Sequence, residues 1–121
     1  MKNSKLNTIK NTEFIVAVDQ INNSRALLPF VLFKKMESYS LYATLPYKEF
    51  ISSKPNLTKL EILKNAFLND KLQIKSHLKK LNEKEIHLSV QVVKELNDCT
   101  DIICKATFSF TVNGLNLYKA S

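Results

Sequence analysis

The sequence predicts a single α+β domain in which one long helix packs against an antiparallel sheet. Three observations support this prediction. A strongly apolar segment, residues 25–44, has the residue spacing of a helix. Three later segments, 70–80, 84–95 and 102–112, alternate apolar and polar residues as half-buried strands do. Short turns join these segments, and strands joined by short turns are antiparallel neighbours.

The first strand and the helix are predicted from the residues before position 44. The run EFIVAV at 13–18 favours a strand, and turn-forming residues follow at 19–24. Five apolar positions recur at steps of three or four and share one helix face: Leu28, Leu32, Met36, Tyr39 and Ala43. Proline is tolerated only in the first turn of a helix, so Pro29 predicts that the regular helix begins near Leu28.

The rest of the sheet is predicted from residues 58–112. The segment 58–64 is a further strand, although its residues also suit a helix. Alternation places these side chains on the inner face: Leu72, Ile74, Leu78, Ile86, Leu88, Val90, Val92, Cys104, Ala106, Phe108, Phe110 and Val112. The helix is apolar on most sides, which requires a curved sheet around it or a second copy of the chain over it.

Length and composition limit the remaining possibilities. The chain has 121 residues, which suits one domain, and we expect this domain at 13–121 after a flexible tail at 1–12. No apolar run approaches the ~20 residues of a membrane helix. The start of the chain lacks the apolar core of a secretory signal. We therefore expect a cytoplasmic protein that does not contact a membrane.

Candidate metal and phosphate sites are sparse. The two cysteines, Cys99 and Cys104, do not form a Cys-x-x-Cys pair, and Cys104 alternates with core residues. His77 and His87 are expected on polar strand faces, without a metal ligand at a suitable spacing. Gly114 is the only glycine, which excludes a Gly-rich phosphate loop. No metal and no cofactor are expected. The formal net charge of +7 favours an anionic partner.

Residues 13–112 resemble the hotdog superfamily, in which an antiparallel sheet wraps a long central helix. Residues 22–37 (NNSRALLPFVLFKKME) resemble the acyl-CoA thioesterase motif Asn-x-His-Gly-x-Leu-Phe-Gly-Gly, followed by a helix that ends in an Asp. Asn22 and Leu27 match the Asn and Leu of the motif, and Glu37 falls on the carboxylate. The chain departs from the motif at several positions: Ser24 replaces the His, Arg25 a Gly, and Pro29 and Phe30 the Gly pair. Asn69 and Asp70 lie where such proteins often have Gly-Asp.

A second alignment places residues 21–39 on the dehydratase motif His-Phe-Pro-Gly-Arg-Pro-x-x-Pro-Gly-Val-Leu. It matches at Arg25, Pro29, Val31 and Leu32. The catalytic His becomes Ile21 and the catalytic Glu becomes Lys35. Removal of water from a hydroxyacyl chain needs a base and an acid. Their absence argues against dehydratase activity.

The resemblance implies an acyl-thioester hydrolase that acts on acyl-CoA or on an acyl-carrier protein. Glu37 would act as base or nucleophile, and Asn22 would orient the water or the thioester carbonyl. Backbone N–H groups of residues 23–28 at the start of the helix, including Asn23 and Ser24, would receive the oxyanion. The related enzymes build such sites across a subunit boundary, so a homodimer or homotetramer is implied.

The resemblance also suggests where the substrate would lie. The acyl chain would pack beside the helix against Phe33, Met36 and Tyr39. Four lysines could hold the phosphates of coenzyme A, an acidic carrier protein or RNA: Lys71, Lys75, Lys79 and Lys80. Nucleic acid is disfavoured because the strand aromatics are expected to face inward. Two alternatives stay open, namely a non-catalytic acyl-thioester-binding protein and a degenerate relative of the 3-hydroxyacyl-carrier-protein dehydratases.

Overall fold

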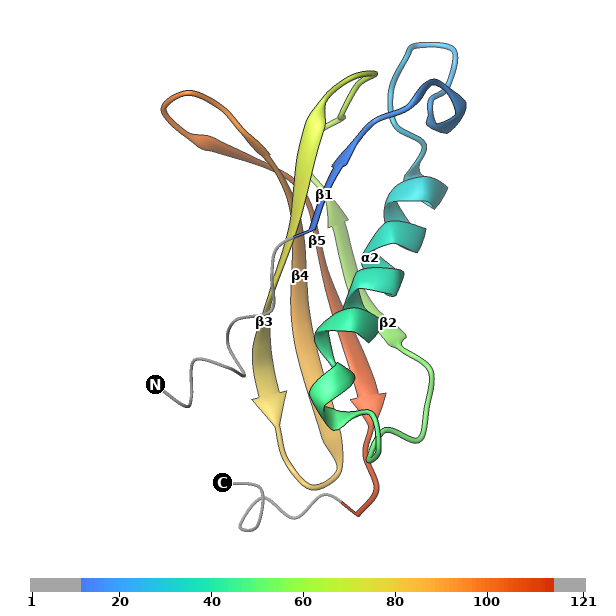
Figure 1. Ribbon diagram of the computed structural model, residues 1–121, viewed down its shortest axis with the longest axis vertical. Helices are drawn as coiled ribbons and strands as arrows, with labels where there is room; N and C mark the ends of the chain where they lie inside the picture. The colour runs from blue at the N-terminus through green and yellow to red at the C-terminus, as the bar shows by residue number, and fades with distance from the viewer. Residues whose placement is uncertain (1–11, 115–121) are drawn as a thin grey trace.

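The computed structural model describes residues 12–114, and it contains one antiparallel sheet with a helix lying along one face (Figure 1). The sheet has five strands in the order β1-β3-β4-β5-β2. The predicted α+β class is therefore confirmed. Most of the predicted tail, residues 1–11, lies outside the described residues, as do residues 115–121 of the predicted domain. Thr12, which the prediction placed in the tail, begins the first strand.

All the predicted elements are present. In chain order they are β1 (Thr12–Ile15), the 3₁₀ turn η1 (Val18–Gln20), α2 (Pro29–Ala43), the 3₁₀ turn η2 (Leu45–Tyr47), β2 (Asn56–Ile62), β3 (Lys71–Leu81), β4 (Glu85–Glu95) and β5 (Thr100–Thr111). The first strand is shorter than predicted, because the chain turns into η1. This turn leaves Val18 75% exposed.

Helix α2 begins where Pro29 predicts. Proline occupies the first helical position, and Leu28 precedes it as the N-cap residue in an extended conformation. Leu28 is only half-buried, and the prediction that it belongs to the inner face is wrong because the cap position lies outside the helix. Leu32, Met36, Tyr39 and Ala43 are buried against the sheet, as their spacing predicts.

The inner face of the sheet is also as predicted. Phe108 and Phe110 on β5 are fully buried, and the Phe33 ring of α2 lies 6.3 Å from the Phe108 ring. Leu78 is the exception in burial. It pairs with buried Leu88 but is 42% exposed, because β1, as described, pairs with β3 only as far as Ile74. Within residues 12–114, no helix is both long and apolar enough to cross a bilayer.

Candidate active site

The loop before α2 is organised by the side chain of Asn22. Its Oδ1 accepts hydrogen bonds from the backbone N–H of Ser24 (2.8 Å) and of Ala26 (3.0 Å). The N–H of Arg25 donates to the Asn22 carbonyl (3.0 Å). This tight turn places Arg25 at φ 65°, in the left-handed region that favours glycine. The side-chain oxygen of Asn22 thus holds the loop, and within the described chain its Nδ2 group has no hydrogen-bond partner.

A second segment, residues 66–70, holds this loop in place. The N–H of Leu27 donates to the Ala66 carbonyl (2.8 Å), and the N–H of Leu68 donates to the Arg25 carbonyl (2.9 Å). Asn69 lies in this segment at φ 73°. The Asp70 carboxylate accepts from the Phe67 N–H and forms an ion pair with Lys94, both at 2.9 Å.

Arg25 and Asn69 are the two non-glycine residues with positive φ in the described chain. Both lie where the thioesterase-like alignment places a glycine of the family. Left-handed backbone costs an arginine about 1 kcal/mol or more, whereas asparagine adopts it more readily, so Arg25 is the stronger sign of a geometric requirement. The backbone thus keeps the shape that glycine would provide at two aligned positions, although the side chains have changed.

Few backbone donors remain free at the start of the helix. The N–H groups of residues 24–28 all have acceptors, and those of Val31 and Leu32 donate to the Leu28 carbonyl. Of the predicted oxyanion donors, Ser24 is therefore engaged, whereas Asn23 has no acceptor within residues 12–114. Pro29 has no N–H. Phe30 N–H also lacks an acceptor in the described chain, and it lies at the positive end of the helix dipole.

Glu37 lies in the middle of α2 with its side chain 29% exposed, 3.6 Å from the ammonium group of Lys34. At 1.5 Å of rise per residue, it is about 12 Å along the axis from the start of the helix. Asn22 lies in the loop before α2, beyond the end of the helix from which this distance is counted.

The side of α2 that carries Glu37 borders uncovered apolar surface. Residues four apart share a helix side, so Glu37 lies on the side of Phe33, which contacts β5. On the adjacent strand β2, Leu60 and Ile62 pair with buried Ala106 and Cys104. Paired residues project to the same face of a sheet. Leu60 and Ile62 thus project to the helix side, yet they are 40% and 47% exposed.

The residues predicted to line the acyl slot do not share one cavity. Met36 is fully buried, with its sulfur 3.7 Å from the Cys104 sulfur. Tyr39 is turned toward β3, where its hydroxyl lies 3.5 Å from the Ser76 hydroxyl, and burial raises its pKa. It lines a groove on the side of α2 opposite Phe33. The predicted substrate contacts therefore lie on two sides of the helix, with Met36 in the core between them.

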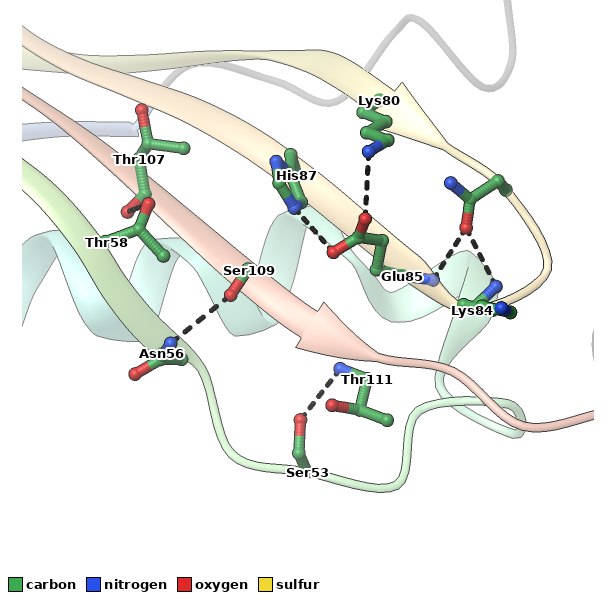
Figure 2. Close-up of polar contacts among 11 residues, drawn as sticks. Ser53, Asn56, Thr58, Lys80, Lys84, Glu85, His87, Thr107, Ser109 and Thr111 are labelled. Atoms are coloured by element: carbon green, nitrogen blue, oxygen red, sulfur yellow. Dashed lines mark hydrogen bonds and ion pairs between the residues drawn. The ribbon is translucent and has the colours of Figure 1, made fainter.

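Lys75 lies on the outer face of the sheet, 3.5 Å from the Glu95 carboxylate, and thus away from the helix. Figure 2 shows other polar side chains of this outer face. Glu85 lies 2.9 Å from both Lys80 and His87, and these two partners lower its pKa. Ser109 pairs with His87 in register, but its hydroxyl contacts Asn56 (3.5 Å).

The structure describes no hydrogen bond between Ser109 and His87 that would make this group a Ser-His-Glu relay. The described residues also contain no cluster of three metal-ligating His, Cys, Asp or Glu side chains. The outer face therefore offers surface ion pairs and hydroxyl groups, and the helix side keeps the candidate catalytic carboxylate.

Comparison with known proteins shows similarity in structure only. No family model matches the chain, and no curated protein matches it in sequence. An acyl-CoA hydrolase from Staphylococcus aureus, solved with butyryl coenzyme A and coenzyme A, superposes with a TM-score of 0.73 at 12% identity, over 85% of this chain. This chain covers 64% of the S. aureus chain, less than two thirds of its length.

Two other solved structures show the same similarity. A hypothetical thioesterase from Streptococcus pneumoniae, solved with coenzyme A, has a TM-score of 0.70 at 18% identity, over 88% of this chain and 79% of its own. A hexameric acyl-CoA thioesterase has a TM-score of 0.73 at 7% identity, over 85% of this chain and 67% of its own. The helix on a five-stranded antiparallel sheet of this chain superposes on these proteins as a shared fold. The chain therefore has the hotdog fold seen in acyl-CoA thioesterases.

Proposed function

We propose that the chain is an acyl-thioester hydrolase that acts on acyl-CoA or an acyl-carrier protein as a homodimer or a pair of dimers. The observation that carries this proposal is the left-handed backbone of Arg25 and Asn69, because both residues occupy glycine positions of the thioesterase-like alignment. That alignment also assigns Asn22 and Glu37 to the motif's Asn and carboxylate.

The S. aureus enzyme supports the same pair of residues. Its structures include alanine variants of an Asn and an Asp that lie fifteen positions apart. Asn22 and Glu37 have this separation here. In the proposed mechanism Glu37 activates a water molecule, which attacks the thioester carbonyl carbon. The C–S bond then breaks, and the products are a carboxylic acid and a thiol.

The other groups of the site stabilise charge. The Nδ2 group of Asn22 is a free donor in the described chain and can orient the thioester carbonyl. Phe30 N–H, at the positive end of the helix, can donate to the oxyanion that forms on that carbonyl. Since Asn22 lies in the loop before α2 and Glu37 in the middle of α2, we place the partner's Asn22 opposite Glu37.

The exposed apolar side chains of β2 support a second copy at this boundary. Leu60 and Ile62 project to the helix side without cover from their own chain, and β2 is an edge strand whose second edge is unpaired in the described sheet. Pairing β2 with its symmetry mate would extend the sheet and cover these side chains. It would also bring a second helix toward the side of α2 that carries Glu37.

The test measures the loss of thioester absorbance with a panel of acyl-CoAs and acyl-carrier proteins. A reagent that detects the released thiol is unsuitable, because it would also react with the exposed Cys99. We expect Glu37→Gln to lose about 10²–10⁴-fold in kcat, while the exposed control Glu49→Gln keeps the parent rate. Hydrolysis that is absent from the parent, or unchanged in Glu37→Gln, would refute the proposal.

The role of Asn22 is tested most directly by Asn22→Asp. An Asp keeps the oxygen that accepts from Ser24 and Ala26, and it lacks the Nδ2 donor. We expect a folded protein with reduced kcat. Mixed dimers of Asn22→Asp and Glu37→Gln chains should regain activity, because one of their two sites would be intact. Failure of mixed dimers to regain activity would place both residues in one subunit or outside the site.

Two observations favour a second candidate function, a non-catalytic acyl-thioester-binding protein. Lys34 forms an ion pair with Glu37, and Pro29 removes one donor from the start of the helix. This alternative predicts thermal stabilisation by acyl-CoA without turnover, and therefore equal stabilisation of the parent and of Glu37→Gln.

A further inference from the structure

An open groove runs between β1 and α2, on the side of the helix opposite Phe33. It encloses about 540 Å³, within the range of small-molecule sites. Its lining comes from Thr12, Glu13 and Phe14, from Gln20, from seven residues of α2, and from Ile74 on β3. Figure 1 shows β1 beside the amino-terminal half of α2. The groove contains neither Glu37 nor Asn22, and Phe30 and Tyr39 are the lining residues that it shares with the candidate active site.

The walls of this groove expose aromatic surface. Phe30 is 68% exposed and Tyr42 is 44% exposed, while Phe14 and Val31 are half-buried. From Val31 to Tyr42 the groove follows about 16 Å of helix. The exposed apolar surface thus forms a trough along the helix, and such a shape suits an extended chain better than a compact ring.

The charge at the rim of the groove is positive. The ammonium group of Lys35 lies 4.6 Å from the centre of the Phe14 ring, and no carboxylate pairs with it in the described chain. Lys34 lies 5.6 Å from the centre of the Phe30 ring and 3.6 Å from Glu37. Glu13 is the one carboxylate of the lining, and it is paired with Lys71 at 3.5 Å. An anionic group at the rim would therefore meet Lys35, which has no carboxylate partner in the described chain, and Lys34, which it would share with Glu37.

We propose that this groove binds a single-chain amphiphile with a carboxylate head group, free in solution. The chain would lie on the aromatic and aliphatic walls, and the carboxylate would contact Lys34 and Lys35. Burial of a methylene group contributes about 0.8 kcal/mol, so a chain along the trough can bind at the concentration of a monomeric amphiphile. Phe30 is the one lining residue with a role in the proposed hydrolysis, through its backbone N–H, whereas the proposed amphiphile contacts its side chain and the two lysines.

The experiment titrates the full chain with dodecanoate below its micellar concentration by calorimetry. Dodecyltrimethylammonium, which has an equal chain and the opposite charge, is the control ligand. We expect dodecanoate to bind at least ten-fold more tightly than the cation. Lys34→Glu with Lys35→Glu should weaken dodecanoate at least ten-fold. The matched control is Lys59→Glu with Lys79→Glu, which changes the net charge equally on the outer face and should leave the affinity unchanged.

A second variant tests shape independently of charge. Ser38 is exposed and lines the groove, so Ser38→Trp should fill the trough and abolish binding without loss of helix content. Asn22→Asp should bind dodecanoate like the parent, because Asn22 does not line the groove, and this result would separate the proposal from the proposed hydrolase activity.

Four results would overturn the proposal. They are no binding to the parent chain, equal losses in the two charge-reversed variants, binding only to phosphatidylcholine–phosphatidylglycerol vesicles, and a change of oligomeric state caused by Ser38→Trp. The third would assign the groove to a membrane surface, and the fourth to a second copy of the chain.

Discussion

Replacement of Met36 by Ala tests how much the packing of α2 on the sheet contributes to stability. Met36 is fully buried, with an exposed fraction of 0%, and its sulfur lies 3.7 Å from the Cys104 sulfur. Removal of three heavy atoms forfeits about 2.4 kcal/mol, at about 0.8 kcal/mol for each methylene-sized group. A residual cavity of about 50 Å³ adds about 1 kcal/mol. We therefore expect Met36→Ala to lower the free energy of unfolding by about 3.5 kcal/mol.

The assay is urea and thermal unfolding followed by circular dichroism. For a domain of this size the expected loss corresponds to a fall in Tm of about 10–15 °C. Met36→Leu preserves most of the volume and should cost less than about 1.5 kcal/mol. A loss below about 1 kcal/mol in Met36→Ala would refute the packing described here. A loss of stability together with an altered acyl-chain preference would assign Met36 the additional role of substrate contact that the sequence predicts.

Three further predictions concern single side chains. Arg25→Gly should stabilise the chain by about 0.5 kcal/mol in urea unfolding, because glycine relieves the left-handed strain at φ 65°, whereas Arg25→Val should destabilise it. Lys80, and then His87, lower the pKa of Glu85 below its ordinary 4.5. The contribution of Glu85 to stability is therefore present above pH 4.5 and is lost as the pH falls through the lowered pKa. In Glu85→Gln, the free energy of unfolding should fall less steeply with decreasing pH. Burial raises the pKa of Cys104 from 9.0 to about 11. Cys99, which is exposed, should therefore react with an aromatic disulfide in the native state, and Cys104 only after unfolding. The free energy of unfolding should fall as the pH rises from 9.0 to about 11.

The fold could be predicted because its main signals are local. The spacing of Leu32, Met36, Tyr39 and Ala43 predicts the buried side of α2, and alternation predicts the inner faces of β4 and β5. Errors arose where the position of an element boundary decides the environment. Leu28 continues the helical spacing, but Pro29 fixes the cap and leaves Leu28 outside the helix. Leu78 continues the alternation, but burial depends on a neighbouring strand that, as described, ends its pairing at Ile74.

The site is harder to predict, because it depends on conformation and on long-range contact. Nothing in the residue type of Arg25 indicates positive φ, since arginine disfavours it, and only the alignment with a glycine pointed to that position. The engagement of Ser24 as a donor depends on how the Asn22 side chain turns back on the loop. The groove is formed by β1 and α2 together, and sequence spacing along either element carries no information about their separation.

The two edge strands of the described sheet differ in the surface that they offer to a second chain. The described β1 has four residues, whereas β2 has seven, with exposed apolar side chains toward the helix. When a strand pairs with the same strand of a second copy, the contact is two-fold symmetric, and the paired edges are no longer available to a third chain. Growth of the sheet through β2 would therefore stop at two chains.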